Sequence, residues 1–244
     1  MKLSAMDDVQ AKTLRTAARY LGIKQPPGFS DSFSDLDPSM EQLLTEAYAD
    51  MRSFAEPRHH LQRGAVRIEH SPEGSASAPW LSFGSMPPVQ SRDLCSLFEG
   101  CEEGFALLAT LGMKLDLRIR RLLATSPALA VAVGACGSAY IDQYIDEVLE
   151  AAQEKENLFF TRRFSPGYGD APLSMQPTVL RFLSATRLGV HCTSGFLMVP
   201  EKSVTALLGI TAAADAMACK ETPAINRNGC AACEKRDCPL RNET

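Results

Sequence analysis

The sequence predicts an α+β protein. Helical and strand-like segments are interspersed along the chain, but not in the regular order of a βαβ series. The longest periodic segment predicts a helix over residues 129–155, apolar nearly all round in its first half. With 244 residues, 45% of them hydrophobic and 22% charged, the chain can bury a sizeable core.

The first ninety residues predict two helices and two short strands. Apolar residues at helical spacing indicate a helix over residues 11–22, and Asp37-Pro38 supplies an N-cap and a first-turn proline for a second one. That helix should end at Glu56-Pro57. Alternation then predicts strands over 66–70 and 80–83, which leaves His59-His60 in a loop.

The centre of the chain predicts a helix, a buried strand and two further helices. Ser91 is a good N-cap, and Gly100 would stop the helix that it begins. The apolar run over 105–111 has the length of a buried strand, and residues 114–124 are helical in pattern ahead of the long helix.

The last third predicts short elements around an irregular loop. Strand-like residues 158–160 precede a loop over 162–172, a helix follows over 174–184, and residues 196–210 indicate two strands.

Charge and the N-terminus exclude several classes of function. Lysine and arginine total 25 against 29 acidic residues, so the net charge of −4 gives no basic surface for nucleic acid or for an anionic membrane. Two acidic residues follow closely on Met1, so no secretory signal is expected, and no apolar run is long enough for a bilayer. We therefore expect a cytoplasmic protein.

The loop over residues 163–172 carries the strongest chemical signal. Its two prolines and two glycines exclude regular structure, and glycine allows backbone N–H groups to approach a ligand closely. Arg163 could hold a carboxylate in a two-pronged contact, and Tyr168 offers a ring and a hydroxyl. A rigid turn with an exposed arginine is the alternative that composition leaves open.

This loop resembles a known signature. Arg163-x-x-x-Gly167-Tyr168-x-x-x-Pro172 is similar to the RxxxGYxxxP motif in the reactivation domain of cobalamin-dependent methionine synthase. Residues 196–205, FLMVPEKSVT, are similar to that domain's Met-x-Pro-x-x-Ser-Val segment. The chain resembles standalone relatives of the domain, which implies a twisted, mainly antiparallel sheet with packed helices.

The resemblance implies a function in reactivation. The family domain binds S-adenosylmethionine (AdoMet) and presents its methyl sulfonium to a cobalamin held by another module. After the cobalt has been oxidised, an electron donor such as a flavodoxin reduces it, and AdoMet remethylates it. We therefore expect the chain to act within a methionine synthase or similar methyltransferase system, and we assign it no catalytic acid, base or nucleophile.

The resemblance also implies the residues that bind AdoMet. Arg163 matches the arginine that contacts the amino-acid moiety, and the loop residues Ser165, Pro166, Gly167 and Tyr168 match the segment around the ligand. The family uses an acidic residue on the preceding helix, for which Asp142 is the nearest match. Asp146 or Glu147 could serve instead, and Asp142 could simply be a solvated helix charge.

The chain departs from the family domain in two respects that concern its partners. It has no cobalamin-binding Asp-x-His-x-x-Gly sequence, so the cobalamin must be carried by a separate methyltransferase subunit. It also adds a tail with Cys230, Cys233 and Cys238, whose spacing suits zinc, an Fe-S cluster or a redox dithiol. An unliganded or disulfide-linked tail is the alternative.

These features predict three regions and two competing functions. Residues 1–90 form an N-terminal region that packs on the core, residues 91–220 form the AdoMet-binding core, and residues 221–244 form the cysteine tail. The first hypothesis is a reactivation factor for the cobalamin of another protein. The second is a metal-binding or Fe-S redox protein with a vestigial AdoMet site.

Overall fold

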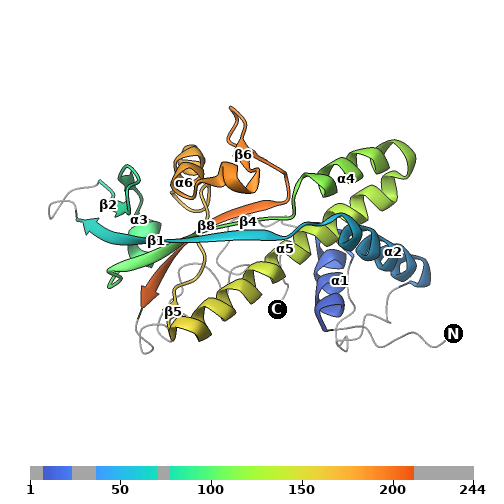
Figure 1. Ribbon diagram of the computed structural model, residues 1–244, viewed down its shortest axis with the longest axis horizontal. Coiled ribbons are helices and arrows are strands. Elements are labelled where there is room, and N and C mark those ends of the chain that lie inside the picture. The colour runs from blue at the N-terminus through green and yellow to red at the C-terminus, as the bar shows by residue number, and fades with distance from the viewer. Residues whose placement is uncertain (1–7, 24–36, 71–76, 212–244) are drawn as a thin grey trace. The chain divides into compact units, whose positions relative to one another are not determined.

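A computed structural model describes residues 8–23, 37–70 and 77–211 of the chain. These residues form an α+β fold whose paired strands are antiparallel, which confirms the predicted class. Figure 1 shows the elements, which are in chain order α1 (Asp8–Tyr20), α2 (Pro38–Phe54), β1 (Arg58–Glu69), β2 (Trp80–Phe83), β3 (Val89–Gln90), α3 (Arg92–Leu97), β4 (Glu103–Thr110), α4 (Met113–Thr125), α5 (Pro127–Glu156), β5 (Phe159–Phe160), η2 (Leu173–Met175), α6 (Gln176–Phe182), η3 (Ala185–Leu188), β6 (His191–Cys192), β7 (Met198–Val199) and β8 (Ser203–Thr211).

The described residues divide into two compact units. The helical unit contains residues 8–23, 37–57 and 111–146, and the sheet unit contains residues 58–70, 77–110 and 147–211. Each unit is assembled from separate stretches of the chain, and α5 contributes to both. The three regions predicted from the sequence, divided at residues 90 and 220, stay a prediction.

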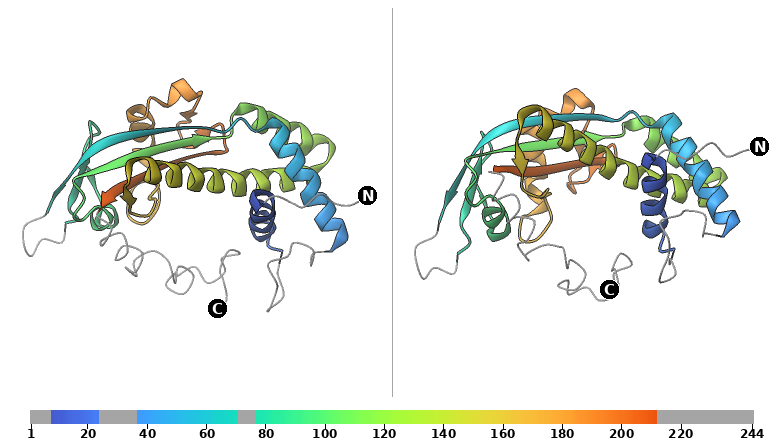
Figure 2. Two further views of the ribbon diagram at one scale, coloured as in Figure 1. Left: turned by 60° about the horizontal axis from the view of Figure 1, so that its bottom comes forward. Right: turned by 90° about the horizontal axis from the view of Figure 1, so that it is seen from below.

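The sheet unit is built on a sheet of six strands in the order β3-β2-β1-β4-β8-β5. Its centre is long and regular: β4 pairs with β1 along its whole length and with β8 from Gly104 to Thr110. Both views in Figure 2 show β1, β4 and β8 side by side in this order. The strands β6 and β7 form a separate pair.

The core of the sheet unit follows from the apolar centre of the sheet. In β4 every residue from Gly104 to Thr110 is buried, as expected for a central strand covered on both faces. The ring of Phe83 lies edge-on to Phe98 at 5.9 Å and to Phe182 at 5.7 Å between centroids. These contacts tie β2, α3 and α6 to one cluster of buried residues.

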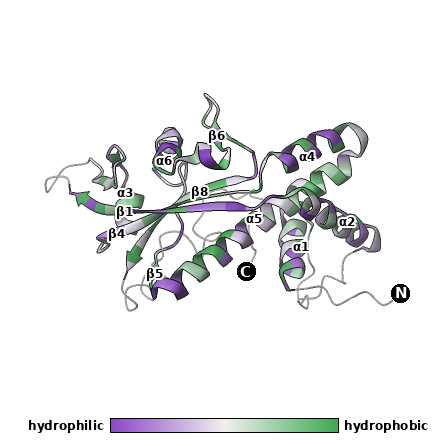
Figure 3. Ribbon diagram, viewed as in Figure 1, coloured by the Kyte–Doolittle hydropathy of each residue, from purple (hydrophilic) through white to green (hydrophobic). Residues whose placement is uncertain are grey.

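Strand β1 corrects one sequence prediction. It begins at Arg58 rather than Val66, so His59 and His60 lie in a strand and not in a loop. Figure 3 shows that the first half of β1 is largely hydrophilic, which leaves no alternating pattern to detect. Residues 58–65 are strand because their backbone pairs with β4, an interaction that does not depend on side-chain polarity.

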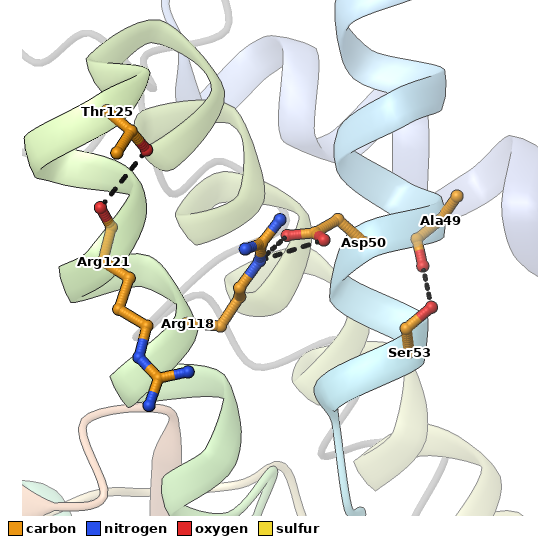
Figure 4. Close-up of polar contacts among 6 residues, drawn as sticks. All are labelled: Ala49, Asp50, Ser53, Arg118, Arg121 and Thr125. Atoms are coloured by element: carbon orange, nitrogen blue, oxygen red, sulfur yellow. Dashed lines mark hydrogen bonds and ion pairs between the residues drawn. The ribbon is translucent and has the colours of Figure 1, made fainter.

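The helical unit is joined by polar contacts as well as by its core. Asp37 caps α2 as predicted, accepting a hydrogen bond from the Ser39 N–H at 2.9 Å. Arg118 on α4 donates from Nε to the Asp50 carboxylate on α2, at 2.9 Å to Oδ2 (Figure 4). Across the described residues no helix is long and apolar enough to cross a membrane.

Candidate functional site

The segment that follows β5 lies along the edge of β8 before it leaves the sheet. The Thr161 N–H donates to the Gly209 carbonyl at 2.9 Å, and Gly209 N–H donates back to the Thr161 hydroxyl at 2.9 Å. Farther on, Phe164 and Leu207 exchange two backbone hydrogen bonds of 3.0 and 2.8 Å. The loop that carries the RxxxGYxxxP motif therefore starts from a fixed position on the sheet.

Arg162 and Arg163 form a β-bulge between these two points of attachment. Both arginines stand opposite the single residue Leu208, since residues 161 and 164 face residues 209 and 207 on β8. A bulge bends its strand and redirects the side chains at that point. Arg163 is partly buried, and its backbone belongs to the bulge of the sheet rather than to a free loop tip.

The loop after the bulge, found between β5 and α6 in Figure 1, is an ordered turn. Tyr168 N–H donates to Ser165 O at 3.2 Å, Ala171 N–H to Tyr168 O at 3.0 Å, and Gly167 N–H to Ala171 O at 3.1 Å. Gly167 and Gly169 have φ of +90° and +52°, which favour glycine. The N–H of Gly167 is therefore used inside the turn. This differs from the expectation that it would approach a ligand.

The turn displays an aromatic side chain to solvent. Tyr168 is 63% exposed, although a tyrosine in a compact protein is usually more buried. Ser165 and Pro166 are partly buried beside it. The five predicted loop residues, from Arg163 to Tyr168, thus lie on one continuous bulge and turn of the sheet unit.

A carboxylate at the end of the turn ties the loop to α3. Asp170 accepts hydrogen bonds from the Ser91 hydroxyl, from Arg92 N–H at 2.7 Å and from Asp93 N–H at 3.3 Å. Its own N–H donates to Oδ2 of Asp93 at 3.1 Å. Burial raises the pKa of Asp170, but the hydrogen bonds from Ser91, Arg92 and Asp93 outweigh it and leave that pKa below its ordinary value.

A buried polar pair connects α6 to the second motif. Gln176 is 2% exposed and begins α6, and its side-chain amide donates to Thr205 Oγ1 on β8 at 2.8 Å. The same amide reaches the sulfur of Met198 on β7 at 3.4 Å. The segment after the Arg163 loop therefore contacts the Met-x-Pro segment, so the two motifs are neighbours within the sheet unit.

The Met-x-Pro segment itself is held at the start of β8. The Val199–Pro200 peptide bond is cis, and the Ser203 hydroxyl donates to the Pro200 carbonyl at 2.7 Å. Ser203 Oγ also lies 2.8 Å from Thr110 Oγ1 at the end of β4. These contacts fix the turn that joins β7 to β8.

Asp142 belongs to a different part of the fold. It lies on α5 in the helical unit, where its Oδ2 accepts a hydrogen bond from the Tyr20 hydroxyl at 3.0 Å. Arg163 belongs to the sheet unit. A contact of Asp142 with the same ligand as Arg163 stays a prediction.

The cysteines fall into two groups. Cys230, Cys233 and Cys238 lie outside the described residues, and within those residues no group of three or more histidine, cysteine or acidic side chains could hold a metal ion. The described cysteines are Cys95, Cys101 and Cys136, which are buried as expected for core residues, and Cys192, which is partly buried. Burial raises the pKa of the Cys136 thiol to about 12, and burial with the Asp170 charge raises that of Cys95 to about 11.

Sequence reasoning missed Asp170 and Gln176 at this site. Asp170 lies within the loop, but its partner Arg92 at the start of α3 is 78 residues earlier in the chain, so nothing local indicates the contact. The predicted N-cap at Ser91 was the nearest available signal. Gln176 looks like an ordinary polar residue on a helix, and its burial depends on β8.

Comparison with known proteins identifies the fold. A crystal structure described as the MetH reactivation domain bound to AdoHcy matches 82% of this chain and 75% of its own chain, with a TM-score of 0.55. The chain has the fold of this reactivation domain. Sequence identity is 16%, so the likeness is one of fold, and it confirms the resemblance to the reactivation domain at that level. The sequence matches no protein-family model and no curated protein.

Proposed function

We propose that this protein binds AdoMet and serves as a reactivation factor for the cobalamin of a separate methionine synthase or corrinoid methyltransferase. Two kinds of observation support the proposal. The fold is that of a reactivation domain whose crystal structure contains AdoHcy, the demethylated form of AdoMet. The RxxxGYxxxP loop is ordered on the sheet, and it combines a partly buried arginine with an exposed tyrosine ring.

The observation that carries the proposal is the bulge at Arg162 and Arg163 followed by the tight turn. An arginine whose backbone is fixed in a sheet is suited to a carboxylate, which its guanidinium can bind through two parallel hydrogen bonds. The Tyr168 ring, 63% exposed, offers a face to an adenine or to a sulfonium cation. Ser165, Pro166 and Gly167 would line the ligand between these two side chains.

The residues present fit AdoMet because the chemistry requires positioning and no proton transfer. When bound, AdoMet would supply a methyl group to the reduced cobalamin of the partner and would leave as AdoHcy. The chain would hold the amino-acid end and the adenosyl end of AdoMet and leave the sulfonium accessible to the partner. The partner supplies the cobalamin, and a one-electron donor such as a flavodoxin supplies the reductant.

The direct test is calorimetric titration with AdoMet and AdoHcy. The wild type is expected to bind both, and Arg163→Ala is expected to weaken AdoMet binding by roughly 10- to 100-fold, since a hydrogen bond to a charged group contributes about 1.5–3 kcal/mol. Arg67→Ala is the matched control, because Arg67 is an exposed arginine on β1 of the same unit. If the wild-type protein shows no binding of AdoMet at millimolar concentration, the proposed function is excluded.

The partner is tested by recovery and by spectroscopy. A cobalamin-binding methyltransferase subunit is expected to copurify with the chain from cells that produce both. When its cobalt has been oxidised, addition of this protein, AdoMet and a one-electron reductant should restore the methylated spectrum. Arg163→Ala should slow that recovery, and an equal rate without this protein would contradict the proposed role.

A further inference from the structure

The Asp170 carboxylate meets the beginning of α3 almost as an N-cap residue of that helix would. It accepts from the Ser91 hydroxyl and from the backbone N–H groups of Arg92 and Asp93. Hydrogen bonds to an ionised acceptor are stronger than those between neutral groups. The first backbone N–H groups of a helix have no partner within that helix, and here an acidic residue from a loop distant in sequence accepts hydrogen bonds from them.

The contact is reciprocal. Asp93 on α3 accepts from the backbone N–H of Asp170 at 3.1 Å, so each aspartate binds backbone of the other segment. In each direction a carboxylate of one segment binds a backbone N–H of the other, so both backbones are held by these hydrogen bonds. The arrangement therefore restricts the path of the loop at residue 170.

Gly169 shows how closely the loop approaches α3. Its φ is +52°, and a Cβ added there would collide with the Asp93 carboxylate, with Cγ only 2.9 Å away. A side chain at this position would have to displace Asp93 and so disturb the contact with Asp170. The approach of backbone to carboxylate depends on glycine.

These hydrogen bonds between Asp170 and the start of α3, called the tie below, lie next to the residues that the proposed function assigns to AdoMet. The turn closes through Ala171 N–H to Tyr168 O, so Asp170 stands inside the hydrogen-bonded segment that carries Tyr168. The loop is attached to the sheet at Phe164 and to α3 at Asp170. Only the short stretch between these attachments carries Ser165 to Tyr168.

We propose that Asp170 is a positioning residue that holds the Arg163–Tyr168 loop in its ligand-binding conformation through its reciprocal hydrogen bonds with the start of α3. The inference rests on the proposed AdoMet site. A loop that is ordered before binding loses less conformational freedom when the ligand arrives. Without the tie the binding-competent conformation is a smaller fraction of the population, and the apparent affinity falls by that fraction.

The first experiment compares Asp170→Ala with Asp170→Asn by AdoMet titration and thermal melting. Asp170→Ala removes every acceptor and is expected to weaken AdoMet binding about tenfold, as for a loop that is competent roughly a tenth of the time. Asp170→Asn keeps one carbonyl oxygen and should recover part of the affinity. Asp37→Ala is the control, because Asp37 caps α2 in the helical unit and touches none of these residues.

The second experiment approaches the same contact from the glycine. Gly169→Ala should weaken AdoMet binding, because its methyl group displaces Asp93. Gly189→Ala is its matched control: Gly189 has φ +72° but has nothing within 4 Å of an added Cβ, so it carries the backbone strain without the collision. Amide hydrogen exchange over residues 163–172 should accelerate in Gly169→Ala and Asp170→Ala and stay unchanged in both controls.

The outcomes separate this inference from the function on which it rests. Unchanged exchange in Asp170→Ala would overturn the tie whether or not AdoMet binds. Faster exchange with unchanged AdoMet affinity would overturn the positioning role, and so would affinity lost only in proportion to a lower melting temperature. Absence of AdoMet binding in the wild type would overturn the positioning role along with the proposed function, even where exchange confirms the tie.

Discussion

Individual side chains at the candidate site act through position more than through unusual reactivity. Arg163 lies in a bulge, Tyr168 projects from a closed turn, and Asp170 holds the end of that turn. A docking site for a reactive cosubstrate needs this kind of arrangement, because the reacting atoms belong to the ligand and to the partner.

The lowered pKa of Asp170 makes one contribution to stability depend on pH. A carboxyl whose pKa is lower in the folded chain than in the unfolded chain stabilises the fold at any pH above the unfolded pKa, near 3.8. That stabilisation is lost as the pH falls through the lower pKa of the folded chain. The groups that face this carboxylate are Asp93, which accepts from the Asp170 N–H, and the Cys95 thiol. Burial and the Asp170 charge raise the pKa of that thiol to about 11, so it stays protonated between pH 5 and 7.

We therefore expect wild type and Asp170→Asn to differ by a constant free energy of unfolding between pH 5 and 7. The difference should shrink below pH 3.8 and vanish once Asp170 is protonated in the folded protein. Urea denaturation of both proteins across this range measures it. A difference that grows towards acid pH would show that the carboxylate destabilises the loop.

Among the elements, β4 organises the sheet unit because it lies between β1 and β8 and is buried along nearly its whole length. Gly104 marks its tightest point. A Cβ there would collide with the Leu208 carbonyl of β8 and lie 3.0 Å from the rings of Phe83 and Phe98. Neither a paired backbone nor two packed rings can move aside easily.

Gly104→Ala is accordingly expected to lower the free energy of unfolding by about 1–3 kcal/mol, the usual cost of overpacking. Gly134→Ala is the control: Gly134 lies in α5 with nothing within 4 Å of an added Cβ. Alanine there should raise stability by about 0.5–1 kcal/mol, because it is the better helix former. Equal stability of the two variants would contradict the packing described for β4.

The sequence predicted helices and buried strands better than polar strands. Asp37 and Ser91 were recognised as N-caps, and β2 was placed on its observed residues, because caps and apolar alternation are local signals. The first half of β1 was missed because its strand state comes from pairing with β4. The bulge at Arg163 likewise depends on the register with β8, which no local pattern contains.

At the level of the whole molecule, the described residues have the fold of a reactivation domain. The sequence continues into a cysteine-containing tail that lies outside those residues. We propose that Cys230, Cys233 and Cys238 bind zinc or an Fe-S cluster, with Cys219 or Cys192 as the fourth ligand. The spacing of these thiols supports this proposal. An Fe-S cluster, unlike zinc, would pass an electron from the one-electron donor to the partner's cobalt.

Anaerobically purified protein is therefore expected to contain zinc, or iron with acid-labile sulfide, in a fixed ratio to the chain. A variant with Cys230, Cys233 and Cys238 replaced by serine should lose the metal and keep its AdoMet affinity, since none of these cysteines belongs to the loop that is proposed to bind AdoMet. Metal-free wild-type protein would exclude the tail as a metal site.

The amino-acid order alone was sufficient for the fold class, the principal helices and the motif loop, because helical periodicity, capping residues and proline–glycine content act over a few neighbouring residues. The extent of β1, the bulge that sets Arg163 and the hold of Asp170 on α3 emerged only from the folded chain. Each of these depends on groups that are far apart in sequence. The strand and the bulge depend on pairing between two backbones, and the hold of Asp170 depends on a carboxylate that meets the backbone of α3, so no local pattern records them.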